Sequence, residues 1–136
     1  MTDYLLDSNI LIWHLRGRKD VVEVLTGLAS EGSLACSAVS VLEVQAGVKR
    51  GEQERTDAFL DGLDVRNVDR QIASQAGHYI RKHREKGITL DFADAIIAST
   101  AVIGDLMLVT ENAAHFPMPE VRLLTPRNGS WANPKP

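Results

Sequence analysis

The sequence predicts an α/β fold in which a mainly parallel sheet is covered by helices on both faces. Short β-like apolar runs alternate along the chain with stretches whose apolar residues recur at helical spacing, and this alternation is typical of parallel sheets. The chain has 136 residues, of which 44% are hydrophobic and 24% charged. These values fit one globular domain that buries one substantial core.

The first half of the chain is expected to hold two strands and four helices. The strands are placed at 4–7 and 34–37, and the helices at 9–15, 20–29, 38–49 and 53–63. In the second helix, apolar residues from Val21 to Leu28 fall on one face. Gly32 breaks that pattern, and Gly51 separates the last two helices.

The second half is expected to hold three strands, two longer helices and one short helical turn. The strands are placed at 65–68, 106–110 and 121–124, the helices at 69–86 and 91–103, and the turn at 113–116. Apolar residues from Ile72 to Ile80 form the buried stripe of the long helix, and Gly87 ends it. We place the domain at 1–125 and expect the proline-rich tail, 126–136, to be irregular.

Charge and apolar content restrict the class of protein. The net charge of −3 predicts no general affinity for nucleic acid, so any such binding must come from a local basic patch. The longest apolar segment, 95–104, is about half the ~20 residues that span a bilayer. Asp3 and Asp7 interrupt the first apolar run, and the single cysteine, Cys36, suits a reducing compartment. We therefore expect a cytoplasmic protein without a membrane partner.

Three acids lie in apolar surroundings. Asp7 ends the first apolar run, Asp94 lies in the first turn of the most apolar helix, and Glu43 lies inside a third helix. A carboxylate is costly to desolvate unless it is paired, hydrogen-bonded or bound to a metal. Capping is an alternative for two of them, since Asp7 could cap the first helix and Asp91 could cap the helix that holds Asp94. Capping does not explain Glu43.

The acids suit a divalent cation. Several carboxylates at close quarters repel one another, and Mg²⁺ or Mn²⁺ relieves that repulsion through hard oxygen ligands. Such a metal can polarise a phosphodiester and help to generate hydroxide. The four histidines are scattered and lack a cysteine pair, so they give no zinc signature. Ser37 is expected to cap a helix, and Ser40 to be the partner of Glu43 one turn away.

Four segments resemble the motifs of PIN-domain nucleases. They are Leu5-Leu6-Asp7-Ser8-Asn9-Ile10-Leu11, Ser37-Ala38-Val39-Ser40-Val41-Leu42-Glu43, Asp94-Ala95-Ile96-Ile97-Ala98, and Leu108-Val109-Thr110-Glu111-Asn112 followed by His115-Phe116. Their order and spacing, and the length of the chain, are similar to those of the VapC toxins of type II (VapBC) toxin–antitoxin systems. The resemblance covers nearly the whole chain.

The resemblance implies a PIN-like three-layer α/β/α sandwich and a Mg²⁺- or Mn²⁺-dependent endoribonuclease. Asp7, Glu43 and Asp94 match the family's three acidic, metal-binding positions. Asn112 matches a fourth catalytic position that is often aspartate, and its neutral side chain leaves a second metal in question. Hydrolysis by metal-activated water would leave a 5′-phosphate and a 3′-hydroxyl.

Further side chains are expected around the acids. By the resemblance, Ser8 and Thr110 orient water or metal ligands, and Ser40 supports Glu43. Asp91 is either an extra acid beside Asp94 or a helix cap, and we favour the cap.

RNA binding at an acidic site needs nearby cations. Arg16 and Arg18 follow the first motif and are the stronger candidates for phosphate contacts. Arg81 and Lys82 lie in the densest basic run, 78–86, which is equally well explained as a solvated helix face.

The resemblance also implies partners. A VapB-type antitoxin would inhibit the enzyme, with residues 11–18 and 57–63 as candidate contacts. A homodimer is expected, and a heterotetramer or larger assembly with the antitoxin. Transfer RNA and ribosomal RNA are the family's usual substrates, and the sequence does not choose between them.

Two alternatives stay open. A receiver-like signalling domain also places aspartates at the ends of parallel strands and binds Mg²⁺, although Glu43 inside a helix has no role there. The second alternative is a catalytically weak PIN-like protein that only binds RNA, because Asn112 weakens metal binding.

Overall fold

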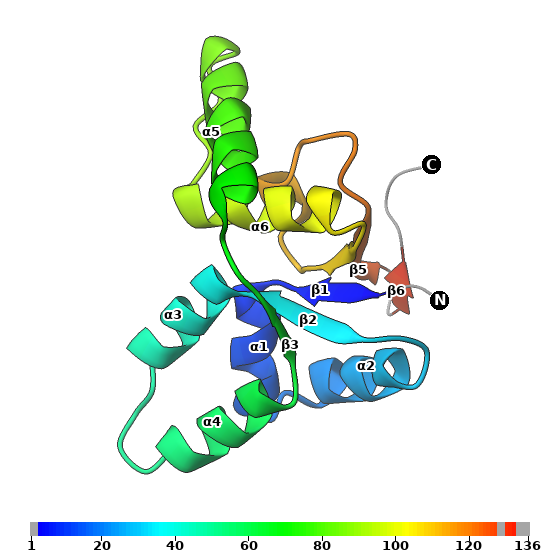
Figure 1. The fold of residues 1–136 in the computed structure, drawn as a ribbon. Helices are drawn as coiled ribbons and strands as arrows, with labels where there is room; N and C mark the ends of the chain where they lie inside the picture. Colours follow the sequence, from blue (N-terminus) through cyan, green and yellow to red (C-terminus); the bar gives the residue numbers. More distant parts are fainter. Residues whose placement is uncertain (1–2, 128–129, 133–136) are drawn as a thin grey trace.

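The computed structural model describes residues 3–127 and 130–132, and its strands form one six-stranded sheet in the order β3-β2-β1-β4-β5-β6 (Figure 1). The strands are Tyr4–Leu6 (β1), Leu34–Ser37 (β2), Asp64–Arg66 (β3), Met107–Val109 (β4), Leu123–Arg127 (β5) and Ser130–Ala132 (β6). β1 to β5 pair in parallel, and β6 pairs antiparallel with β5. The predicted α/β class with a mainly parallel sheet is confirmed.

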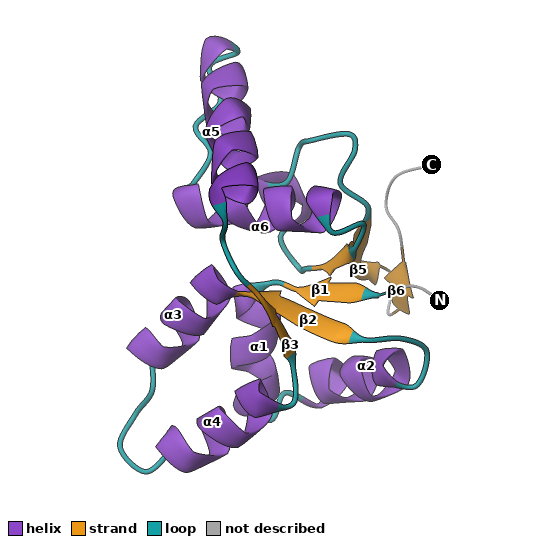
Figure 2. Cartoon of the chain, viewed as in Figure 1, coloured by secondary structure: helices purple, strands orange, loops and turns teal. Residues whose placement is uncertain are grey.

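Helices lie on both sides of this sheet, which makes three layers (Figure 2). The helices are Ser8–Leu15 (α1), Lys19–Ala29 (α2), Ala38–Ala46 (α3), Gln53–Asp61 (α4), Arg70–Glu85 (α5) and Phe92–Ile103 (α6), with a 3₁₀ turn at Ala113–His115 (η1). α1, α2 and α4 lie on one side, and α5 and α6 on the other (Figure 1). No described helix is long and apolar enough to cross a membrane.

Alternating side chains of β1 feed two separate cores. Tyr4 and Leu6 pack with α1 and α2 residues such as Leu11 and Val21, whereas Leu5 packs with Ile97 of α6 in the opposite core. This alternation follows from the two-residue period of a strand. A strand buried on both faces in this way requires the continuous apolar run that the sequence shows.

The order of the strands fixes where a ligand can bind. The chain leaves β1 in one direction to β2 and β3, and β4 and β5 lie on the other side of β1. Ligands of open α/β sheets bind at the carboxyl ends of the strands where this direction reverses. Asp7 follows β1 there, and its backbone N–H donates to the carbonyl of Val109 in β4 (3.0 Å). Receiver domains have the order 2-1-3-4-5, so the receiver-like alternative is wrong.

Some predicted boundaries are wrong. α3 ends at Ala46 and is followed by Gly47, three residues before the predicted end at 49. Residues 126–127 and 130–132 were expected to be irregular, but β5 and β6 form an antiparallel hairpin in which Thr125 pairs with Ala132. Pro126 lies beyond the β5 residues that pair with β4, so its missing N–H is not needed on that side. The rest of the expected irregular tail lies outside the described residues.

Candidate active site

The acidic residues of the four motifs meet in one pocket, called here the acidic pocket. It has a volume of about 250 Å³ and is lined by Asp7, Ser8, Asn9, Glu43, Asp91, Asp94, Asn112 and His115. These residues come from the start of α1, from α3, from the start of α6 and from the segment after β4. The structure therefore brings together the four residues predicted to be catalytic, Asp7, Glu43, Asp94 and Asn112.

Asp7 is both a helix cap and a fixed member of the acidic pocket. One carboxylate oxygen accepts from the backbone N–H of Ser8 (2.8 Å), and the other accepts from the Thr110 hydroxyl (2.7 Å). Burial raises the pKa of Asp7, and the two hydrogen bonds oppose that rise. Because both oxygens are held, the orientation of this carboxylate is set by the protein.

Ser8 connects α1 to the acid of α3. Its Oγ lies 2.7 Å from Glu43 Oε1 and 2.8 Å from Ser40 Oγ. A hydroxyl has one proton and a carboxylate only accepts, so when Ser8 donates to Glu43, Ser40 must donate to Ser8. Ser40 was expected to be the partner of Glu43, and the hydrogen bonds connect the two side chains through Ser8.

Asp94 lies in the first turn of α6, where its side chain is 19% exposed. Burial, followed by the negative charge of Asp7, raises the pKa of Asp94 to about 6. His115 Nδ1 lies 3.3 Å from Asp94 Oδ2, and this contact favours the ionised carboxylate. The pKa of Asp94 is therefore close to neutral pH.

Asp91 occupies the N-cap position of α6, as expected, but its side chain makes no capping hydrogen bond. The carboxylate instead lines the acidic pocket. The favoured interpretation as a cap is correct for the backbone position and wrong for the side chain.

The segment after β4 joins the pocket through Thr110. The buried Thr110 hydroxyl donates to Asp7 and accepts from the backbone N–H of Asn112 (2.9 Å). This places Asn112 at the pocket and fixes the turn that follows. Sequence reasoning missed His115 and Asn9 as lining residues. Both lie within or beside the motifs, but no periodicity indicates which way their side chains point.

The four expected RNA-binding cations do not line the acidic pocket. Arg18 donates four hydrogen bonds, two to Asp20 and two to Glu111, and its guanidinium lies 5.3 Å from the centre of the Trp13 ring. Its donors are thus engaged within the protein, and its role in phosphate binding stays a prediction. Arg16 lines a second pocket, and Arg81 and Lys82 lie on α5.

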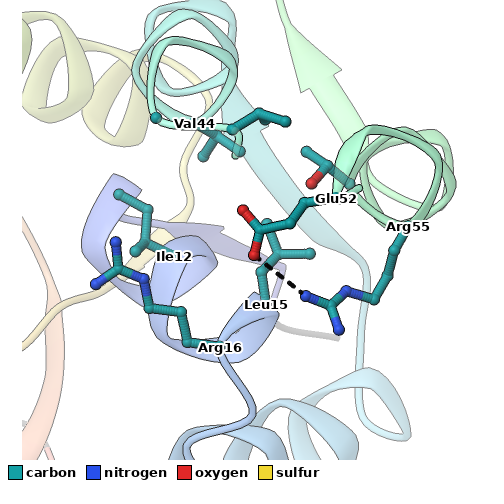
Figure 3. Close-up of a pocket in the computed structure, with 9 residues that line it drawn as sticks. Ile12, Leu15, Arg16, Val44, Glu52 and Arg55 are labelled. Carbon is teal, nitrogen blue, oxygen red and sulfur yellow. Dashed lines mark ion pairs between the residues drawn. The ribbon is translucent and has the colours of Figure 1, made fainter. Parts of the chain in front are cut away.

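The second pocket is a groove between α1, α3 and α4 (Figure 3). Ile12, Leu15 and Val44 give it apolar walls. Charged residues also line the groove, and two of them, Glu52 and Arg55, form an ion pair at 3.6 Å. Arg16 reaches the groove from α1, as Figure 3 shows.

The donors of the acidic pocket fit a hard divalent cation, although the carboxylates are not yet turned toward one point. Over residues 3–127 and 130–132, no three His, Cys, Asp or Glu side chains lie close enough to hold a metal ion. Glu43 is turned to Ser8, and Asp94 faces His115. The electrostatic repulsion between these acids favours a cation among them.

This fold with an acidic pocket at the ends of β1 and β4 defines a PIN-type protein. The PIN-domain family model matches residues 4–117, and the chain belongs to that family.

Within the family, the chain groups with the VapC ribonucleases. It is 36% identical over 114 residues to ribonuclease VapC10 of Mycobacterium tuberculosis, covering 84% of this chain and 86% of that protein. It is 34% identical over 115 residues to ribonuclease VapC19 of the same organism, covering 84% and 92%. A chain of VapBC2 from Rickettsia felis, solved bound to a promoter DNA fragment, has a TM-score of 0.83 at 25% identity and covers 93% of this chain and 100% of its own.

Proposed function

We propose that this protein is an endoribonuclease toxin that hydrolyses RNA phosphodiesters with the aid of Mg²⁺ or Mn²⁺ and is inhibited by a VapB-type antitoxin. The observation that carries the proposal is the acidic pocket, where Asp7, Glu43 and Asp94 meet from three distant segments. The names of the VapC10 and VapC19 ribonucleases support the same activity.

Asp7, Glu43 and Asp94 are the residues that would hold the cation. When bound, it would offset the repulsion among the carboxylates, polarise the phosphodiester and acidify the attacking water. Asn112 adds an oxygen donor without charge, so a single cation satisfies this set of ligands.

The protein's own contribution is positioning. Thr110 and Ser8 fix the orientation of Asp7 before substrate arrives. In the reaction, the water oxygen bonds to phosphorus and loses a proton, while the bond from phosphorus to the 3′ oxygen breaks and that oxygen gains a proton. One RNA fragment then ends in a 3′-hydroxyl and the other begins with a 5′-phosphate.

The substrate we propose is an exposed loop of transfer RNA or ribosomal RNA. In this proposal the acidic pocket binds the scissile phosphate, a group that every RNA sequence carries. Sequencing of the cleaved ends would distinguish the two RNA classes.

The groove between α1, α3 and α4 is the proposed site of the antitoxin. Its apolar walls suit the apolar face of a partner segment, and Arg16 and Arg55 suit acidic residues beside that face. The groove includes part of the segment 11–18 that the sequence indicated. We also propose that the protein is a homodimer and forms larger assemblies with the antitoxin, which sedimentation would measure.

The decisive experiment incubates antitoxin-free protein with total cellular RNA in Mg²⁺, in Mn²⁺ and in EDTA. We expect cleavage with either cation and none in EDTA. Asp94→Asn should abolish cleavage, whereas Asp61→Asn, which neutralises an exposed acid of α4, should not. Identical RNA profiles with and without the cations would refute the nuclease, and intact binding without cleavage would favour the RNA-binding alternative.

A further inference from the structure

A third pocket, called here the basic pocket, lies between α5 and residues 117–120. It has a volume of about 210 Å³. α5 lines it with His78, Lys82 and His83, and Lys86 follows directly after the helix. These positions fall on one side of α5, because residues four apart share a helix face. The basic run that the sequence singled out thus faces, in part, a defined hollow.

The lysines of the basic pocket are available to an anion. Neither Lys82 nor Lys86 has an ion-pair partner in the part of the chain that the structure describes, whereas Arg18, Arg66 and Arg122 each pair with an acid. The acid in the lining, Glu120, is engaged by the Tyr79 hydroxyl. With two lysines against one acid, the lining has an excess of formal positive charge that a bound anion can offset.

His83 gives the pocket a fixed polar group. It is buried, and its Nδ1 lies 2.8 Å from the carbonyl oxygen of Tyr79. A carbonyl only accepts, so Nδ1 carries the proton and the orientation of the ring is fixed. On the preceding turn, His78 Nδ1 lies 3.2 Å from the Arg81 guanidinium, which can only donate. The Nε2 of His78 is therefore protonated and can donate to an anion.

One short segment links the basic pocket to the acidic pocket. His115 lines the acidic pocket, and Pro117 lines the basic pocket. Two residues of chain span at most about 7 Å. The linings of the two pockets therefore approach each other at this segment. When the scissile phosphate of an RNA strand lies beside His115, another phosphate a few nucleotides along the strand lies near Pro117.

We infer that the basic pocket binds a backbone phosphate of the substrate RNA, a few nucleotides from the scissile bond. The inference rests on the proposed function, because it assumes that RNA occupies the acidic pocket. An acidic pocket in a protein of net charge −3 repels RNA, so affinity must come from a local group of cations. A phosphate contact of this kind positions the strand without reading its sequence.

The test measures binding separately from cleavage. Fluorescence anisotropy of labelled bulk transfer RNA is recorded in EDTA over a range of potassium chloride concentrations. The Lys82→Ala/Lys86→Ala double variant is compared with wild type and with Arg70→Ala/Arg84→Ala, which removes two charges from α5 outside the pocket. Thermal melting shows that each variant is folded.

We expect the lysine variant to lose about tenfold in affinity, and its plot of log affinity against log salt to be shallower by about 0.7 to 1.4, as for one or two lost phosphate contacts. The arginine variant should lose clearly less. An equal loss in both variants, or no loss in either, would overturn the inference. If the lysine variant cleaves RNA with Mg²⁺ and its KM is unchanged, the inference is also overturned, but the proposed nuclease activity is not. Normal RNA binding without any cleavage would instead refute the nuclease alone.

Discussion

Arg18 and Glu111 form a two-point ion pair between segments that are 93 residues apart, with Nη1 2.8 Å from Oε1 and Nη2 2.7 Å from Oε2. Arg18 precedes α2, and Glu111 lies between Thr110 and Asn112. The pair therefore anchors the segment after β4 to the start of α2. Since Thr110 in turn holds Asp7, the ion pair positions the acidic pocket without lining it.

Loss of this anchor should lower the rate more than the affinity. For Arg18→Met and Glu111→Gln we expect kcat to fall by about tenfold, because small displacements of catalytic groups are costly, while KM changes little. The double variant should be no worse than Arg18→Met alone, since that substitution already removes the Arg18–Glu111 pair. Arg66→Met is the matched control, because Arg66 pairs with Asp64 at the far edge of the sheet. Steady-state cleavage of an RNA oligonucleotide measures both constants, and additive losses would contradict the anchor.

The same pair shows what the sequence could and could not predict. Asp7, Glu43 and Asp94 follow from their places beside or within apolar runs, and the resemblance then adds Asn112. The partner of Arg18 could not be inferred, because a long-range side-chain contact leaves no local pattern. The antiparallel pairing of residues 130–132 depends on long-range packing in the same way. Local sequence shows which residues are chemically unusual, and the tertiary fold decides their partners.

Thr110→Val should impair catalysis by freeing Asp7. The hydroxyl donates to Asp7 and accepts from the Asn112 backbone, so valine leaves a buried carboxylate oxygen and an N–H without this partner. We expect kcat/KM to fall by about 10- to 100-fold, as for other groups that orient metal ligands. The free energy of unfolding should fall by about 1–3 kcal/mol. Thr100→Val is the control, because the buried Thr100 hydroxyl bonds only a carbonyl of its own helix. Equal activity of the two variants would contradict a positioning role for Thr110.

Asp94→Asn should stabilise the protein without bound metal while abolishing cleavage. The folded-state pKa of Asp94, raised to about 6, exceeds the ordinary value, so the stabilising contribution of the protonated form is lost as pH rises through about 6. At neutral pH the asparagine variant should therefore have a free energy of unfolding higher by about 1–3 kcal/mol. The difference should shrink below about pH 6 and vanish near pH 4.

Thermal melting in EDTA across this pH range measures the effect. In wild type, Mg²⁺ should raise the Tm at neutral pH, because a cation offsets the repulsion among the acids, and in Asp94→Asn it should raise it less. Asp61→Asn serves as the exposed control. A variant that melts below wild type at neutral pH in EDTA would show that Asp94 stabilises the fold as a charged group, contrary to the assignment.

A charge placed in the groove between α1, α3 and α4 should separate inhibition from catalysis. Val48 lines this groove and is absent from the acidic pocket. Val48→Glu puts a carboxylate among apolar walls, so the affinity for a VapB-type antitoxin should fall by at least about tenfold, with RNA cleavage unchanged. Val68→Glu is the matched control, because Val68 is 37% exposed and lies outside the groove. Titration of each variant with the cognate antitoxin gives the concentration for half inhibition. Unaltered inhibition of Val48→Glu would place the antitoxin elsewhere, and loss of cleavage in the absence of antitoxin would show that the groove also supports the acidic pocket.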